Sequence, residues 1–184
     1  KTILPTRSRD TYIFSRYQAY NCILSPIHYD WTLMSLPSRA FNEPANLVRE
    51  RYGPPPFGNL LSANCSGSTL LNFGQAPWIT LHQIGNWRDH VWHWLLTEIY
   101  EDCAPPRPAL NGEPYYAGWP DYRGWPDYEG WSEEDFIGGT LEDDAAARSG
   151  MYGSFLSGGL AGHIYGAQGI WGGDIEPEVV RNTM

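Results

Sequence analysis

The stretch from residue 78 to residue 113, WITLHQIGNWRDHVWHWLLTEIYEDCAPPRPALNGE, decides the fold class. It begins with Trp78–Gln83, a short apolar run of the kind that forms a buried β-strand. From His90 to Asp102, apolar residues recur at every fourth position, which predicts a helix that ends before a pair of prolines. A second strand is expected at Arg107–Glu113. Two strands joined through a helix in this way predict a parallel pair.

The same pattern repeats on both sides of this stretch. We expect further strands at Asn21–His28, Leu60–Cys65 and Gly162–Gly166, and further helices at Asp10–Tyr20, Glu43–Tyr52 and Ala145–Leu156. Strands that alternate with helices predict an α/β fold with a parallel sheet, and the polar and aromatic clusters after the strands favour a (β/α)8 TIM barrel. A complete barrel has eight strands in about 250 residues, whereas five strands are predicted here.

Composition narrows the classes of function. The chain has 184 residues, with 12 basic and 21 acidic side chains and a net charge of −9, which argues against a nucleic-acid partner. The three cysteines are widely spaced, so we expect free thiols and neither a disulfide framework nor a zinc site. No membrane segment and no signal peptide are visible in these residues. The length predicts one domain over residues 1–184.

Two carboxylates stand out because each follows an apolar strand. Asp30 comes directly after the first predicted strand, and Glu113 ends the fourth, so both should lie at the carboxyl end of a parallel sheet. Such a pair can hydrolyse a glycosidic bond, one acid protonating the leaving oxygen while the other attacks the sugar or activates water. For Asp30, an ordinary loop-capping role is an equally good interpretation. Glu113 lies between a glycine and a proline, with two tyrosines following, which favours a functional role.

Side chains suited to binding a sugar surround these two acids in the sequence. Flat aromatic faces can stack on a sugar ring, and amide, imidazole and guanidinium groups can bond its hydroxyls. The candidates are Trp31, Trp87, Tyr115, Tyr116, Trp119, Tyr165 and Trp171 for stacking, and His28, Asn64, His82, Gln83, Asn86, Arg88 and His163 for hydrogen bonding. About half of the nine tryptophans are expected only to pack in the core or in loops.

Signals for a cofactor or metal are weak. His90 and His93 are three residues apart on a predicted helix, but no carboxylate or HExxH motif accompanies them, and a solvated helix face explains them better. The glycine-rich segments near the carboxyl end lack the order of a nucleotide-binding loop. We therefore expect no cofactor and no metal.

Three motifs carry a family resemblance. Residues 78–88 (WITLHQIGNWR), 111–116 (NGEPYY) and 148–171 (RSGMYGSFLSGGLAGHIYGAQGIW) resemble the apiosidase-like glycoside hydrolases of family 140 and its relatives. This resemblance implies a (β/α)8 barrel of which the chain supplies strands four to eight, so that residues 1–184 are the carboxyl-terminal portion of a single catalytic barrel domain. It also implies that Asp30 matches the acid/base, that Glu113 matches the nucleophile, and that the protein is secreted or periplasmic.

The main hypothesis is a retaining glycoside hydrolase that cleaves a plant or algal cell-wall polysaccharide. Strands one to three of the family barrel have no counterpart here, so a missing amino-terminal segment or a second chain would have to complete the barrel. The alternative is a half-barrel that binds carbohydrate or a partner without catalysis. A third possibility is a structural protein that uses the repeated Trp-Pro-Asp-Tyr loop between residues 118 and 128.

Overall fold

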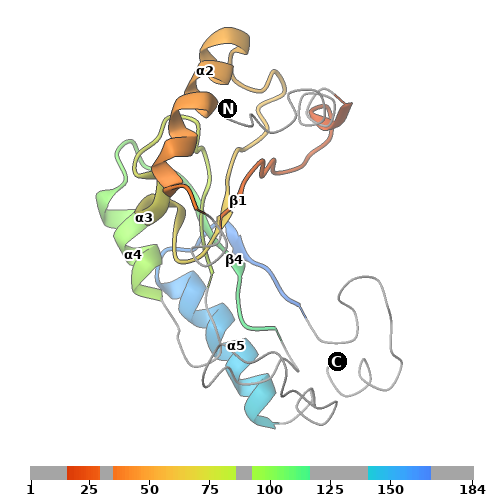
Figure 1. The fold of residues 1–184 in the computed structure, drawn as a ribbon. Coiled ribbons are helices and arrows are strands. Elements are labelled where there is room, and N and C mark those ends of the chain that lie inside the picture. Colours follow the sequence, from red (N-terminus) through yellow and green to blue (C-terminus); the bar gives the residue numbers. More distant parts are fainter. Residues whose placement is uncertain (1–15, 30–34, 86–92, 117–140, 167–184) are drawn as a thin grey trace.

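A computed structural model describes residues 16–29, 35–85, 93–116 and 141–166 (Figure 1). Its strands are β1 (His28–Tyr29), β2 (Asn64–Cys65), β3 (His82–Gly85), β4 (Ala109–Glu113) and β5 (Gly162–His163). Its helices are the 3-10 helix η1 (Ser38–Phe41), α2 (Asn42–Tyr52), α3 (Thr69–Phe73), α4 (His93–Asp102) and α5 (Leu141–Leu156). Each of the five predicted ranges overlaps a strand, and each strand is shorter than its predicted range. Strand β1 shares only His28 with its prediction, and β3 shares only His82 and Gln83.

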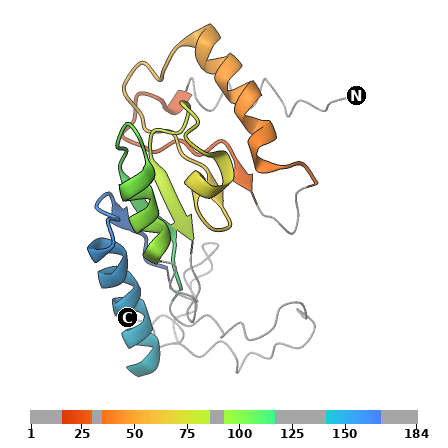
Figure 2. The ribbon, with the colours of Figure 1, turned by 90° about the vertical axis from the view of Figure 1, so that its left-hand side faces the viewer.

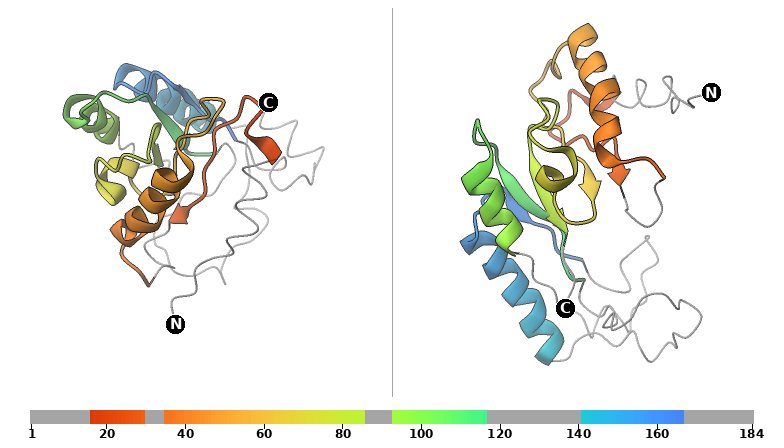
Figure 3. Two further views of the ribbon diagram at one scale, coloured as in Figure 1. Left: turned by 90° about the horizontal axis from the view of Figure 1, so that it is seen from above. Right: turned by 60° about the vertical axis from the view of Figure 1, so that its left-hand side comes forward.

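The strands follow one another in sequence order and are parallel. β1 pairs with β2, and β3, β4 and β5 form a second parallel sheet in that order. The two sheets meet where the backbone N–H groups of Thr80 and Leu81 both donate to the carbonyl of Leu61, at 2.9 and 3.0 Å. Helices α3, α4 and α5 lie on one side of the strands (Figures 2 and 3). This is the α/β arrangement expected from the sequence, present as part of a barrel.

Two apolar clusters hold the helices to the strands. The first joins β1 and β2 to α3, with Phe73 packed edge-on against Trp78 at a ring-centroid distance of 5.3 Å. The second places Leu95, Leu96 and Ile99 of α4 against β3 and β4. The fourfold spacing of apolar residues in α4 thus corresponds to its buried face.

Helix α3 and the 3-10 helix η1 were not predicted. Helix α3 begins after Ser68, whose side-chain oxygen accepts a hydrogen bond from the Leu71 N–H at 3.0 Å, and it ends at Gly74, which has a φ of 64°. These are ordinary start and stop signals, but five residues are too few to show a helical period. Most of the predicted helix at residues 10–20 lies outside the described residues, as does the loop at residues 118–128.

The three cysteines are free thiols, as the sequence predicted, with Cys65 and Cys103 buried. Within the described ranges, no helix combines the length and the apolar character that crossing a membrane requires.

Candidate active site

The strands present two faces, and the alternation of side chains decides which residues share each face. On β3, His82 and Ile84 point toward the helices, since His82 bonds to Thr69 of α3 and Ile84 packs against α4. Gln83 and Gly85 therefore belong to the opposite face, which we call the inner face. On β2, Cys65 packs in the helix-side cluster, so its neighbour Asn64 also belongs to the inner face.

Glu113 reaches the inner face because the pairing of β3 with β4 shifts. Ile84 pairs with Asn111, but the next residue of β3, Gly85, pairs with Glu113, so that Gly112 is an extra residue in β4. Asn111 faces the helices, where its amide donates to the Ser154 hydroxyl of α5. Strict alternation would place Glu113 on that side as well. The bulge instead brings Glu113 opposite Gly85, and a Cβ built on Gly85 would lie 3.6 Å from the Cβ of Glu113.

The negative charge of Glu113 acts on two neighbouring groups. Burial raises the pKa of the Cys65 thiol to about 12; a hydrogen bond with Asn72 opposes this rise, and the Glu113 carboxylate adds a smaller contribution to it. Burial likewise raises the pKa of Tyr116 to about 12, again with a contribution from Glu113. Glu113 is therefore near both the end of β2 and the tyrosine that follows β4. Both neighbours stay protonated at neutral pH.

Tyr115 and Tyr116 follow the end of β4 closely. Tyr115 is buried and Tyr116 is half-buried. The ring of Tyr116 covers Gly166, where a Cβ would overlap it. The glycine thus lets the aromatic ring lie across the segment that follows β5. Tyr165, the neighbour of Gly166, is exposed.

His28 and Asn64 form the other part of the inner face. They pair across β1 and β2, and the Asn64 Nδ2 lies 3.5 Å from the His28 Nδ1. Asp30 comes two residues after His28 but lies outside the described residues. The same holds for Trp31, Asn86, Trp87, Arg88, Trp119 and Trp171.

Two of the predicted sugar-binding histidines lie on the helix side instead. His82 is completely buried, its Nδ1 lying 2.7 Å from the Thr69 hydroxyl and its Nε2 lying 3.3 Å from the Cys103 sulfur. Burial, with a smaller effect of Arg107, lowers the pKa of His82 to about 4. Because both ring nitrogens are engaged inside the core, His82 stabilises the fold and does not belong with the inner-face residues.

His163 lies beneath α5. Its Nδ1 is 3.0 Å from the Ser154 hydroxyl, which itself donates to the carbonyl of Gly150 at 2.7 Å. Since that hydroxyl has one proton and gives it to Gly150, the His163 Nδ1 must be the donor toward Ser154. Burial, and then the nearby His93, lower the pKa of His163, so the ring is neutral at pH 7. Sequence reasoning missed the roles of Ser154 and Asn111 in this network.

A metal centre finds no support in the described residues. No group of three or more His, Cys, Asp or Glu side chains gathers there in a way that could hold an ion. His93, one of the two histidines considered for a metal, packs its ring directly on Gly153 of α5, where a Cβ would overlap it. His90 lies outside the described residues.

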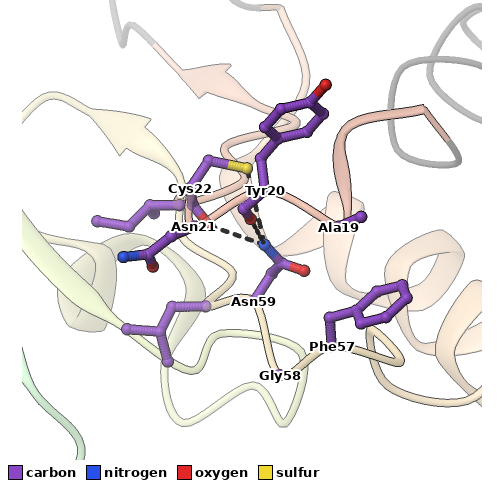
Figure 4. Close-up of a pocket in the computed structure, with 9 residues that line it drawn as sticks. Ala19, Tyr20, Asn21, Cys22, Phe57, Gly58 and Asn59 are labelled. Carbon is purple, nitrogen blue, oxygen red and sulfur yellow. Dashed lines mark hydrogen bonds between the residues drawn. The ribbon is translucent and has the colours of Figure 1, made fainter.

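A pocket of about 570 Å³ lies near the amino ends of β1 and β2 (Figure 4). Residues 19–23, which precede β1, and residues 57–60, which precede β2, form its lining. There the Asn59 amide donates to the carbonyls of Tyr20 and Cys22, at 2.8 and 3.1 Å. None of the predicted site residues lines this pocket.

The fold and the inner face together define the class of protein: a barrel-type α/β domain with a carboxylate at the carboxyl end of a central parallel strand. The family model "Apiosidase-like, catalytic domain" matches residues 10–178. The chain belongs to this apiosidase-like catalytic-domain family.

Solved structures support the same fold. One, described as a glycoside hydrolase, has a TM-score of 0.61 and 19% identity over 92% of this chain and 38% of its own. Another, a glycoside hydrolase family 5 protein from Bacteroides vulgatus ATCC 8482, has a TM-score of 0.56 and 19% identity over 88% of this chain and 34% of its own. The chain thus spans little more than a third of the length of these two structures. A search of curated proteins found no match.

Proposed function

We propose that this protein is part of a glycoside hydrolase that cleaves glycosidic bonds in a plant or algal cell-wall polysaccharide. The observation that carries the proposal is the bulge in β4, which directs Glu113 to the inner face at the carboxyl end of the strands. In barrels of this type, catalytic groups come from the carboxyl ends of the strands. Membership of the apiosidase-like family supports the reaction class and suggests apiose as the sugar released.

In the proposed mechanism Glu113 is the nucleophile and Asp30 the acid/base. A Glu113 carboxylate oxygen attacks the anomeric carbon as the bond to the leaving oxygen breaks, and Asp30 gives its proton to that oxygen. Asp30 then takes a proton from water, whose oxygen displaces Glu113 from the sugar. This double displacement retains the anomeric configuration and requires the two carboxyl groups to be about 5–5.5 Å apart.

Several inner-face groups would bind the sugar. His28 and Asn64 offer a ring nitrogen and an amide side by side, and Tyr116 offers a protonated phenol near Glu113. Gln83 faces the same side, but its Nε2 already donates to the Ala63 carbonyl. Trp31, Asn86, Trp87, Arg88, Trp119, Tyr165 and Trp171 remain candidates from the sequence. The family resemblance also favours a secreted or periplasmic protein.

The proposed enzyme needs further strands. Among the described strands, β1 pairs only with β2 and β5 only with β4. Large apolar side chains are exposed near both edges, including Tyr20 and Ile23 before β1 and Ile164 after β5. An amino-terminal segment or a second chain that supplies three more strands would cover these edges.

The same exposed edges favour the second candidate, a half-barrel that binds carbohydrate or a partner without catalysis. Native mass spectrometry separates the two. A monomer of 20.8 kDa that binds pectin oligosaccharides without cleaving them would favour the binder, whereas a longer mature chain or a stable complex would favour the enzyme.

Replacing Glu113 by Gln tests the catalytic role. We expect turnover of 4-nitrophenyl β-D-apioside by the intact protein to fall by a factor on the order of 10³ or more, because the amide is a poor nucleophile. The matched control is Glu101→Gln, which makes the same change on the exposed surface of α4. In a Glu113→Ala variant, added azide should restore turnover and yield a glycosyl azide. Full activity of Glu113→Gln in a folded protein would reject the assignment.

A further inference from the structure

Gln83 occupies a special place on the inner face because it lies between two other strands. Its Nε2 donates a hydrogen bond to the Ala63 carbonyl, which directly precedes β2. Its Oε1 lies against Gly112, the extra residue of β4, so closely that a Cβ at residue 112 would overlap it. The side-chain amide of Gln83 on β3 thus contacts both the residue before β2 and the bulge in β4.

The space around the bulge is tightly filled at Gly112. A Cβ on Gly112 would also lie 3.1 Å from the Leu110 Cδ1, so the backbone is enclosed from two sides. At Gly85, a Cβ would lie 3.4 Å from the Glu113 carbonyl and 3.8 Å from the Cys65 carbonyl. The Gln83 side chain therefore packs tightly on Gly112, whereas at Gly85 the neighbouring groups of β4 and β2 lie at ordinary contact distance.

The consequence of losing the bulge follows from the strand period. If Gly85 paired with Gly112, as strict alternation requires, the register would slip by one residue and Glu113 would turn to the helix side. There it would share a face with Asn111, which is completely buried beneath α5. A carboxylate in that position would have no access to a ligand on the inner face.

We propose that Gln83 is the positioning residue for Glu113: its amide, anchored on the Ala63 carbonyl, holds the Gly112 bulge that aims the carboxylate at the inner face. The functional part of this inference rests on the proposed role of Glu113. The geometric part, that Gln83 holds the bulge, does not rest on that role, because the bulge is present whether or not Glu113 is catalytic. The sequence predicted that Gln83 binds sugar. In the positioning role, its amide is bonded to the protein instead.

The variant Gln83→Met removes the hydrogen bond of the Gln83 side chain but keeps its volume. Methionine has nearly the same length and fills the same gap, but it has no N–H to donate to Ala63. The control is Gln75→Met, since the Gln75 amide also bridges backbone groups, donating to the Asp102 carbonyl at 3.0 Å and accepting from the Ala104 N–H at 3.1 Å.

The first measurement is the NMR contact between the β protons of Glu113 and the α protons of Gly85. The close approach of these two residues predicts a clear NOE in the unsubstituted protein and in Gln75→Met. We expect Gln83→Met to lose it. A Gln83→Met protein that keeps this NOE at full intensity would overturn the inference. If that variant does not fold, Gly112→Ala serves in its place. The Cβ added at residue 112 would clash with the Gln83 Oε1 and should weaken the same NOE.

The second measurement uses 4-nitrophenyl β-D-apioside. A displacement of about 1 Å at the nucleophile lowers kcat by on the order of 10²-fold, and we expect this loss in Gln83→Met with KM nearly unchanged. A raised KM with unchanged kcat would instead show that Gln83 binds the sugar, and would overturn the positioning role. If Glu113→Gln is fully active while Gln83→Met loses the NOE, the proposed function fails and the geometric inference stands.

Discussion

Acidification should destabilise this protein through His82, a histidine that the fold keeps neutral. The ring is completely buried between the Thr69 hydroxyl and the Cys103 thiol. Burial lowers its pKa from the usual 6.5 to about 4, and the positive charge of Arg107 acts in the same direction. In the unfolded chain the imidazole is exposed to water and has its ordinary pKa.

The sign of the effect follows from which state binds more protons. Between pH 6.5 and pH 4 the unfolded chain protonates this histidine while the folded protein does not, so acid favours unfolding. The stabilisation is fully present above pH 6.5 and is lost as the pH falls toward 4. Each unit of pH within this window is worth about 1.36 kcal/mol, which gives a loss of about 2.5 kcal/mol by pH 4.5.

Urea unfolding at pH 7 and pH 4.5 measures this loss. The comparison is between the unsubstituted protein and His82→Gln, which carries no titratable group at this position. His82→Gln should be less stable at pH 7, but its stability should fall by about 2.5 kcal/mol less on acidification, since titration of all other groups is common to both proteins. Equal losses in the two proteins would refute the reasoning. A larger loss in the variant would refute it as well.

Three further predictions concern single residues. Ser154→Ala removes the hydroxyl that accepts from the Asn111 amide inside the core, and should lower the free energy of unfolding by about 1–3 kcal/mol in urea; an unchanged midpoint would contradict this. Leu96→Ala empties a completely buried position of α4 and should cost about 2–5 kcal/mol by the same measurement. At pH 8 a thiol reagent should label the half-buried Cys22 well before Cys65, whose pKa is about 12; equal labelling rates in the folded protein would contradict the structure.

The elements themselves were predictable because their signals are local. The apolar runs at Leu60–Cys65 and Arg107–Glu113 contain strands β2 and β4, and the fourfold apolar spacing of α4 gives its buried face. Helix α3 could not be found in this way. Its five residues are too few to show a helical repeat, and its Phe73 packs on Tyr29, which is distant in sequence.

The candidate site was less predictable because a strand has two faces. His82 and Gln83 are adjacent in sequence, and both are polar residues near the end of an apolar run. Only the contact of His82 with Thr69 in α3 tells which one enters the core and which one faces away from the helices. Sequence spacing places such a pair on opposite faces but does not say which face carries the helices.

Glu113 shows why alternation alone fails at the site. Counting from Ala109, which packs against α4, strict alternation assigns Glu113 to the helix side, where a carboxylate would lose its hydration. Because Gly112 is an extra residue in β4, the pairing shifts by one residue and Glu113 turns to the opposite, inner face. The sequence signal was present in Gly85 and Gly112, two glycines near the ends of adjacent strands. Whether these glycines form a bulge depends, in our proposal, on the hydrogen bond from Gln83 to Ala63. That contact forms only when β2 packs against β3. The departure from the regular strand pattern is therefore also the feature on which the proposed role of the carboxylate depends.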